Sequence, residues 1–350
     1  MGKEIEKEIK KKKYNEGAAG QAAFSRRSDF RHRPARIAHR GDIWSGPENT
    51  MSAFRGAVTR GCEGIETDIR KTADGKIVVA HDAGFARVMC GASEPEKRSI
   101  HEMTLEQVCR VSLPFAGHLL DWFPENGLEN ELYAYFPWDL DDRETIRARA
   151  MQCLNASEGL PGEERLNRMF SWFHENYRDV YRILRKRDGR QEHYVPLETF
   201  LKWLDTLPEG FFAEIECKED GLIEETDRLL RSTGTARRCI LFSGIESCNR
   251  EIQSFYRLHA KPEGLRFGAN LRFLNDETLP LLDDWDLYEV GLNAGTYGKK
   301  ETDFLHEKGI LVFSNLGDTP SWWSEMDHNG TDGFKTNCLD IYNMKKRFPF

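Results

Sequence analysis

Two acidic side chains stand two residues apart in a run with the alternating pattern of a β-strand. They are Glu66 and Asp68 in GIETDIR, residues 64–70. Residues two apart in a strand project to the same face, so Ile65 and Ile69 face the other way, toward a helical layer. Neighbouring carboxylates repel each other unless a proton or a cation lies between them. The pair therefore predicts a site for a hard divalent cation such as Mg²⁺ or Ca²⁺; the alternative is two exposed carboxylates on an edge strand.

A second acidic run, FFAEIECK at residues 211–218, carries Glu214, Glu216 and Lys218 on one face of another predicted strand. A carboxylate beside an ammonium group forms either an internal ion pair or a metal ligand next to a phosphate-binding cation. Both glutamates share their face with the lysine. The spacing alone therefore leaves open which glutamate is the ligand.

Two histidines each end a predicted strand and each has a charged neighbour. His39 precedes Arg40, and His81 precedes Asp82. A single histidine is more often structural than catalytic, but catalytic groups gather at the C-terminal ends of barrel strands, and an imidazole exchanges protons near neutral pH. Arg40 adds a planar, permanently charged donor that suits phosphate oxygens. The two strand ends therefore indicate acid–base chemistry.

The elements that must position these groups alternate along the chain. Strands are predicted at residues 35–39, 64–70, 76–81, 211–217, 239–244, 265–271, 287–293 and 310–315. Amphipathic helices are predicted at 222–232 and 252–259, and a further helix is expected between an N-cap at Asn49 or Thr50 and a stop at Gly61. Strands that alternate with helices form a parallel sheet with the helices outside. Eight of them favour an α/β fold, a TIM-like (β/α)8 barrel.

One long stretch interrupts this alternation. Residues 110–193 contain no strand of matching type, and apolar residues recur at helical spacing from Leu166 to Leu184. We predict a charged N-terminal tail over 1–33, a barrel domain over 34–350 and, within it, a mainly helical insertion subdomain over 110–193 after the third strand. The insertion either covers the active site as an enlarged βα loop or packs against the side of the barrel; both placements stay open.

Composition limits the class of protein and its partners. The chain has 350 residues, 39% hydrophobic and 31% charged, as expected of a soluble globular protein. A net charge of −8 disfavours a nucleic-acid partner, and no apolar run approaches the ~18 residues of a membrane span. The eight cysteines are scattered without a C-x-x-C pair, which favours reduced thiols and a cytoplasmic location. The oligomeric state cannot be read from the sequence.

The motifs around these residues resemble those of glycerophosphodiester phosphodiesterases, in the PLC-like phosphodiesterase superfamily. His39-Arg40-Gly41 is followed by PENT at 47–50, then by GIETD, TADG and VVAHD in the family's order. Beyond the insertion, VPLETFL, the E-x-K of Glu216 and Lys218, and GTDGFKT at 330–336 are similar as well. Phe313, Ser314 and Asn315 stand where the family usually has Trp-Thr, and Asn337 replaces its aspartate.

The resemblance implies metal-dependent hydrolysis of a glycerophosphodiester, a small-molecule substrate, to glycerol phosphate and an alcohol. It implies these roles: metal ligands Glu66, Asp68 and Glu216, with Glu48 as an additional candidate; acid–base residues His39 and His81; phosphate-binding residues Arg40 and Lys218. The cation would be Mg²⁺ or Ca²⁺.

Two alternatives keep the same fold. In the first, aromatic residues of the insertion stack against a carbohydrate, and the enzyme makes or cleaves a sugar phosphodiester. The residues in question are Trp122, Tyr133, Tyr135, Phe136 and Trp138. In the second, the chain is a non-catalytic relative that binds a phosphodiester or a protein partner; it would have no need to keep both histidines and both acidic motifs.

Overall fold

The computed structural model describes residues 34–43, 45–86, 88–89, 96–115, 188–316, 320–337 and 339. The predicted tail over 1–33 lies outside the described residues, as do the long helix predicted over 166–184 and the aromatic residues of the insertion.

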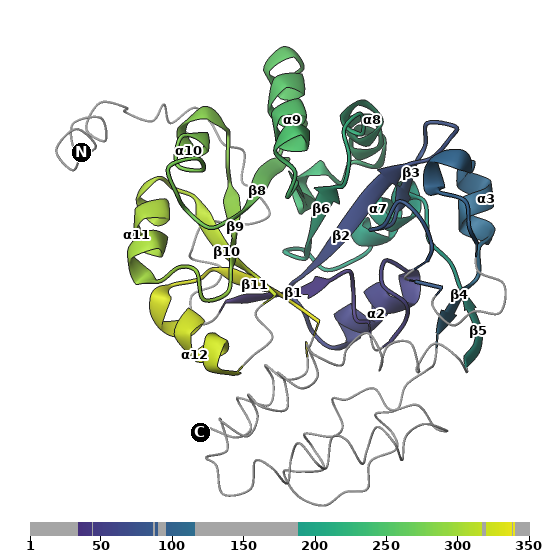
Figure 1. The fold of residues 1–350 in the computed structure, drawn as a ribbon, viewed down its shortest axis with the longest axis horizontal. Coiled ribbons are helices and arrows are strands. Elements are labelled where there is room, and N and C mark those ends of the chain that lie inside the picture. Colours follow the sequence, from purple (N-terminus) through teal and green to yellow (C-terminus); the bar gives the residue numbers. More distant parts are fainter. Residues whose placement is uncertain are drawn as a thin grey trace, which may run out of the picture.

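Eight parallel strands close into a barrel (Figure 1). They are β1 (Ala35–His39), β2 (Gly64–Lys71), β6 (Phe212–Cys217), β7 (Cys239–Phe242), β8 (Arg266–Arg272), β9 (Glu289–Asn293), β10 (Leu311–Asn315) and β11 (Gly333–Thr336). The ring closes because β1 pairs with both β2 and β11; Ile37 is in register with Gly64 on one side and Lys335 on the other. The predicted TIM-like (β/α)8 barrel is confirmed.

Two strand assignments differ from the prediction. Residues 76–81 were expected to form a barrel strand, but β3 (Ile77–Val79) pairs antiparallel with β2 outside the ring. A tight turn joins the two strands, with Gly75 at φ 73°, and a parallel connection needs a dozen or more residues. The eighth barrel strand is β11, which was not predicted as a strand.

The insertion is described only at its ends. These form β4 (Leu113–Phe115) and β5 (Asp188–Glu192), which pair antiparallel. The stretch predicted as the insertion comes after β3 in chain order. Since β3 is not part of the ring, however, the insertion lies between the second and third strands of the barrel. Its bounds and helical content stay predictions.

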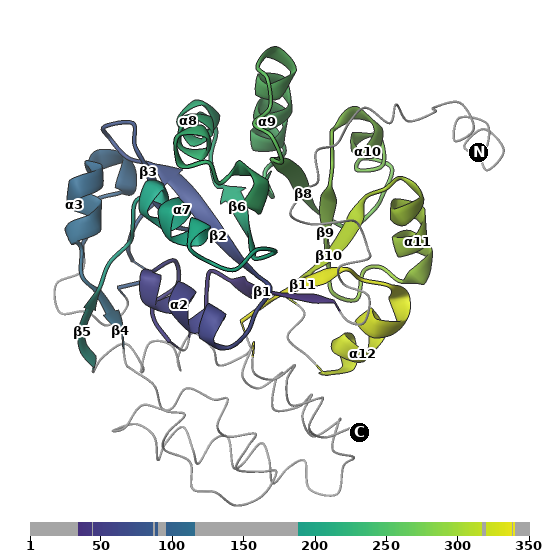
Figure 2. The same cartoon turned by 180° about the vertical axis from the view of Figure 1, so that it is seen from behind.

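Helices surround the barrel on its outer side (Figures 1 and 2). The α-helices are α2 (Met51–Thr59), α3 (Leu105–Arg110), α7 (Leu197–Asp205), α8 (Ile223–Thr233), α9 (Glu246–Leu258), α10 (Leu281–Asp284), α11 (Lys299–Glu307) and α12 (Pro320–Asn329). Short 3-10 turns occupy Ile100–Glu102 and Ala236–Arg238. Of the two predicted caps of α2, Thr50 is the one used, with its Oγ1 accepting from Ala53 N.

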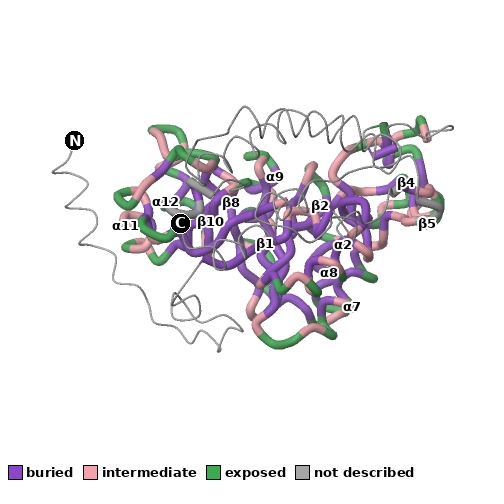
Figure 3. Tube along the Cα trace, turned by 90° about the horizontal axis from the view of Figure 1, so that it is seen from below, coloured by how far each residue is buried: buried purple, intermediate pink, exposed green. Residues whose placement is uncertain are grey.

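The strands separate two apolar regions, and the barrel is buried along most of its length (Figure 3). Outward-facing residues such as Ile65 and Ile69 pack under the helices, as the alternation of β2 predicts. Inside, a plug fills the N-terminal part of the barrel; its members are Ile37, Phe212, Ile240, Leu311 and Phe313. This plug leaves the C-terminal half of the interior to polar side chains.

Directly above the plug lies a buried charged cluster of Glu214, Lys335 and Glu289. Lys335 Nζ is 3.0 Å from Glu214 Oε1 and 4.4 Å from the centroid of the Phe242 ring. Burial, and then the neighbouring Glu214, raise the pKa of Glu289 well above its usual range, which favours its neutral form. Glu214 is thus an internal partner of Lys335.

The fit of Glu289 depends on a glycine of the next strand. A Cβ at Gly268 would lie 1.8 Å from Glu289 Oε1. We expect Gly268→Ala to lower the free energy of unfolding by about 1–3 kcal/mol, because the buried carboxyl has to move within a packed interior. Urea unfolding measures the change. Gly84→Ala is the control, since a Cβ at Gly84 meets no atom of the described residues within 4 Å. Equal stability of the two variants would contradict this account.

Candidate active site

Three carboxylates meet at the C-terminal mouth of the barrel. On the paired strands β2 and β6, Asp68 is in register with Glu216, two residues nearer the mouth than the pair of Glu66 and Glu214. Glu66, Asp68 and Glu216 each offer an oxygen, and these oxygens lie within 4.8 Å of one another. The structure therefore brings together the three predicted ligands, and depth in the barrel separates Glu216 from Glu214.

Asp68 is held as an anion by the groups around it. Arg40 Nε lies 3.2 Å from its Oδ2, and Lys218 Nζ lies 3.1 Å from its Oδ1. Lys218 Nζ also lies 2.9 Å from Glu216 Oε1. Burial alone would raise the pKa of Asp68, but Arg40 and Lys218 outweigh burial and hold the pKa below its usual range. Both predicted phosphate-binding cations therefore border the carboxylate cluster.

Glu66 has the opposite electrostatic balance. Burial, followed by the charges of Asp68 and Glu216, raises its pKa well above the usual range. Its Oε2 accepts from the backbone N–H of Arg40 at 3.1 Å. Within the described part of the chain, its buried Oε1 has no hydrogen-bond partner. Such an oxygen is costly unless a proton or cation satisfies it. An oxygen-only donor set with an unsatisfied buried atom fits a hard divalent cation.

The loop between β1 and α2 folds back onto β2. Arg40 and Asn49 both have φ 60°, and the N–H of Asn49 donates to the Arg40 carbonyl at 2.9 Å. Asn49 Nδ2 then donates to Asp68 Oδ2 at 2.9 Å, and its Oδ1 accepts from Thr67 Oγ1 at 2.8 Å. From the sequence, the role predicted for Asn49 is that of a possible helix cap. Its side chain instead orients a candidate metal ligand.

Gly41 of the His39-Arg40-Gly41 motif and Glu48 of the PENT motif each have a structural role. A Cβ at Gly41 would lie 2.8 Å from Ala53, so only glycine lets the loop pass so close to α2. Glu48 is buried, and its Oε1 lies 3.2 Å from Arg40 Nη1. Glu48 thus pairs with the guanidinium and is not part of the three-carboxylate cluster.

His39 lies at the end of β1 with its ring fixed by a neighbour across the barrel wall. Its Nδ1 is 2.9 Å from Asn337 Oδ1, which follows β11. An amide oxygen only accepts, so Nδ1 carries the proton and Nε2 has the free lone pair. Burial, and then the charge of Arg40, lower the pKa of His39 to about 3. His39 is therefore a neutral imidazole able to accept a proton at pH 7.

His81 reaches this region by a different route from the predicted one. It does not end a barrel strand; it follows the antiparallel β3, whose path returns toward the mouth. The N–H of Ala80 donates to the Asp68 carbonyl at 2.9 Å, which fixes the segment against β2. The Nδ1 of His81 donates to Asp82 Oδ1 at 2.6 Å. The predicted charged neighbour therefore orients the ring.

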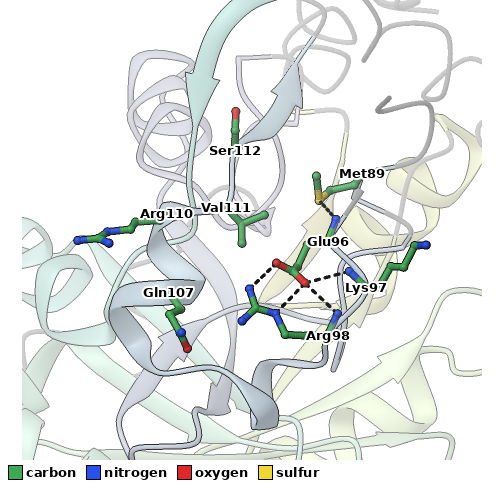
Figure 4. Close-up of a pocket in the computed structure, with 8 residues that line it drawn as sticks. All are labelled: Met89, Glu96, Lys97, Arg98, Gln107, Arg110, Val111 and Ser112. Atoms are coloured by element: carbon green, nitrogen blue, oxygen red, sulfur yellow. Dashed lines mark hydrogen bonds and ion pairs between the residues drawn. The ribbon is translucent and has the colours of Figure 1, made fainter. Parts of the chain in front are cut away.

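A separate pocket of about 590 Å³ lies beside α3 (Figure 4). It is lined by basic side chains such as Lys97, Arg98 and Arg110 together with Glu96. The Glu96 carboxylate is already held by Arg98, whose Nη2 lies 2.7 Å away. None of the three clustered carboxylates or the two histidines lines this pocket, so it is not part of the candidate active site.

The fold and the mouth cluster define a class: a TIM barrel whose polar site occupies the strand ends where barrel enzymes place their active sites. The model of the Glycerophosphoryl diester phosphodiesterase family matches residues 39–154. Over this N-terminal part the chain is similar to glycerophosphodiester phosphodiesterases, and the solved structures given below share its fold. Among the described helices, none has the length and apolarity to cross a membrane.

Curated glycerophosphodiester phosphodiesterases are similar to this chain over part of its length. Bovine glycerophosphodiester phosphodiesterase 1 is 34% identical over 125 residues, 36% of this chain and 32% of the relative. A glycerophosphodiester phosphodiesterase of Caldanaerobacter subterraneus is 42% identical over 75 residues, 21% of this chain and 29% of the relative. The chain therefore spans about a third of the length of the curated relatives it matches, 32% and 29% for these two.

Solved structures show the same fold over most of the chain. A putative glycerophosphodiester phosphodiesterase from Galdieria sulphuraria superposes with a TM-score of 0.59 at 14% identity, over 89% of this chain and 98% of that one. An Oleispira antarctica phosphodiesterase, solved with the product sn-glycerol-3-phosphate, gives a TM-score of 0.57 at 14% identity, over 91% and 98%.

Proposed function

We propose that this chain hydrolyses a glycerophosphodiester to glycerol phosphate and an alcohol. The observation that carries the proposal is the meeting of Glu66, Asp68 and Glu216 within 4.8 Å at the barrel mouth, with Arg40 and Lys218 at its border. A phosphodiester is an anion whose charge shifts toward its oxygens in the transition state. Fixed cations around those oxygens lower the barrier. The product complex of the Oleispira relative supports glycerol phosphate as the product class.

The three carboxylates would hold one divalent cation, Mg²⁺ or Ca²⁺. When bound, this cation supplies electrostatic stabilisation of a phosphate oxygen, typically worth several kcal/mol. Lys218 now bridges Asp68 and Glu216. Beside a cation that neutralises these carboxylates, the ammonium group is available to a phosphate oxygen. Arg40 keeps its contact with Glu48 and presents a planar donor from the other side.

The histidines carry the proton transfers. His39 Nε2 accepts the proton of the attacking hydroxyl, because Nδ1 is committed to Asn337. His81, oriented by Asp82, donates a proton to the oxygen of the departing alcohol. The attacking hydroxyl is the glycerol hydroxyl next to the phosphate, which gives a cyclic phosphate that water then opens.

The free thiols of the described cysteines suit a cytoplasmic location.

The direct test is a panel of diesters offered to the purified chain with Mg²⁺ or Ca²⁺. Glycerophosphocholine, glycerophosphoethanolamine and glycerophosphoglycerol are expected to release glycerol phosphate, which a coupled dehydrogenase assay detects. A strong chelator should stop the release, and added cation should restore it. Full activity with chelator would rule out the metal site. No release from any diester by a folded, metal-supplemented chain would rule out the proposed hydrolysis. Turnover of sugar phosphodiesters alone would favour the alternative in which the enzyme makes or cleaves a sugar phosphodiester.

A further inference from the structure

Three asparagines stand side by side at the mouth, across the barrel from β2. Asn270, Asn293 and Asn315 lie near the C-terminal ends of β8, β9 and β10 and are here called the asparagine arc. Asn315 Nδ2 donates to Asn270 Oδ1 at 2.7 Å and to Asn293 Oδ1 at 3.3 Å. All three side chains are half-buried, so they border the mouth without being sealed in the core.

A glycine makes room for this arrangement. Gly291 on β9 is in register with Asn270 on one side and Phe313 on the other. A Cβ at Gly291 would lie 2.9 Å from Asn315 Oδ1 and 3.3 Å from its Nδ2. The amide of Asn315 therefore crosses over β9 to reach β8, and it can do so only because residue 291 has no side chain.

A buried lysine sets the orientation of the amides. Lys335 Nζ lies 3.4 Å from Asn315 Oδ1, and an ammonium group can only donate. Asn315 must therefore turn its oxygen to Lys335 and its NH2 group to the other two amides. The oxygens of Asn270 and Asn293 each accept from Asn315 and are thereby turned toward it. Among the described residues, the Nδ2 groups of Asn270 and Asn293 have no hydrogen-bond partner, so the asparagine arc presents donors.

These donors border the carboxylate cluster. A Cβ placed on Gly244 would lie 3.3 Å from Glu216 Oε1 and 3.7 Å from Asn270 Nδ2, so both groups flank the same small space. If one substituent of a phosphate held at the cluster extends over β8 and β9, it meets these donors. The group that the asparagine arc contacts must suit the positive ends of amide dipoles.

We propose that the asparagine arc binds the non-glycerol half of the substrate and that this half is polyhydroxylated, a polyol or a sugar. The inference rests on the proposed diester hydrolysis. Hydroxyl oxygens accept from amide N–H groups, so each contact adds a hydrogen bond. The trimethylammonium group of choline has nothing to accept with and is repelled by the same dipoles, and such cations are usually bound over aromatic faces. The asparagine arc thus selects for oxygen and against a cationic headgroup.

The test compares glycerophosphoinositol with glycerophosphocholine, which share the glycerol phosphate half. Any general effect on the metal, phosphate or glycerol cancels in the ratio of their kcat/KM values. We expect the unmodified chain to favour glycerophosphoinositol, and Asn293→Leu to lower that ratio by about tenfold, the loss of one hydrogen bond. Asn315→Asp should do more: its carboxylate accepts from Lys335 and from both neighbouring amides, which turns their oxygens to the mouth and shifts the ratio toward choline.

The other possible results each contradict a specific part of the proposal. An equal loss on both substrates in Asn293→Leu would place the glycerol half on the asparagine arc and overturn the proposal, as would an unchanged ratio in Asn315→Asp. If the unmodified chain hydrolyses neither diester, the proposed reaction fails. Calorimetric binding of the same two compounds then tests the asparagine arc: tighter binding of glycerophosphoinositol that is lost in Asn293→Leu supports it, and equal binding overturns it.

Discussion

Glu66→Gln is expected to abolish cation binding at the barrel mouth and to lower kcat by about 10²–10³-fold, while the cation-free protein keeps its stability. The raised pKa of Glu66 favours the protonated, neutral form of this side chain when no cation is present. Glutamine has nearly the same shape and the same neutral charge, so the cation-free fold should not distinguish the two. A divalent cation, however, requires the ionised carboxylate.

Calorimetry with Mg²⁺ and Ca²⁺ measures the first effect, and thermal unfolding in chelator measures the second. The matched control is Glu214→Gln, on the same face of β6 as Glu216. It removes the partner of the buried Lys335 and should lower stability, because it leaves that ammonium without its closest counter-charge. Unchanged cation affinity in Glu66→Gln would refute the assignment of the carboxylate cluster. Equal loss of stability in both variants would refute the charge states argued for them.

Much of the barrel follows from local patterns. Period-two alternation in β2 and β6 places their carboxylates inward and the isoleucines outward, and the parallel register then aligns Asp68 with Glu216. The pattern does not show depth: Glu214 and Glu216 are equivalent in the sequence, and only the packing of Lys335 beneath the mouth separates them. The strand β11 was not predicted because burial, like depth, cannot be read from the pattern. Its GFKT run contains a lysine that looks exposed, yet Lys335 is buried inside the barrel.

The sequence also does not predict which strands pair, or the side-chain roles that depend on backbone conformation. Residues 76–81 have the apolar character of a barrel strand, but the short turn at Gly75 forces an antiparallel pairing. Asn49 is a plausible helix cap by position, yet its positive φ turns the amide to Asp68. The link between His39 and Asn337 spans 298 residues and becomes visible only once β1 and β11 are neighbours.

His39→Ala and His81→Ala are each expected to lower kcat by about 10²–10⁴-fold with the fold intact. The His39→Ala variant lacks the proposed base. With its pKa lowered to about 3, the ring of His39 stays neutral from pH 8 down to pH 5, so its Nε2 can accept a proton over that range. Protonation of His39 therefore cannot cause any decline in kcat/KM over that range, and its ring resonances should not titrate there by NMR. His101→Ala is the control, an exposed histidine 3.0 Å from Glu219 that should leave kcat nearly unchanged. Near-normal turnover in both site variants would rule out acid–base catalysis by these imidazoles.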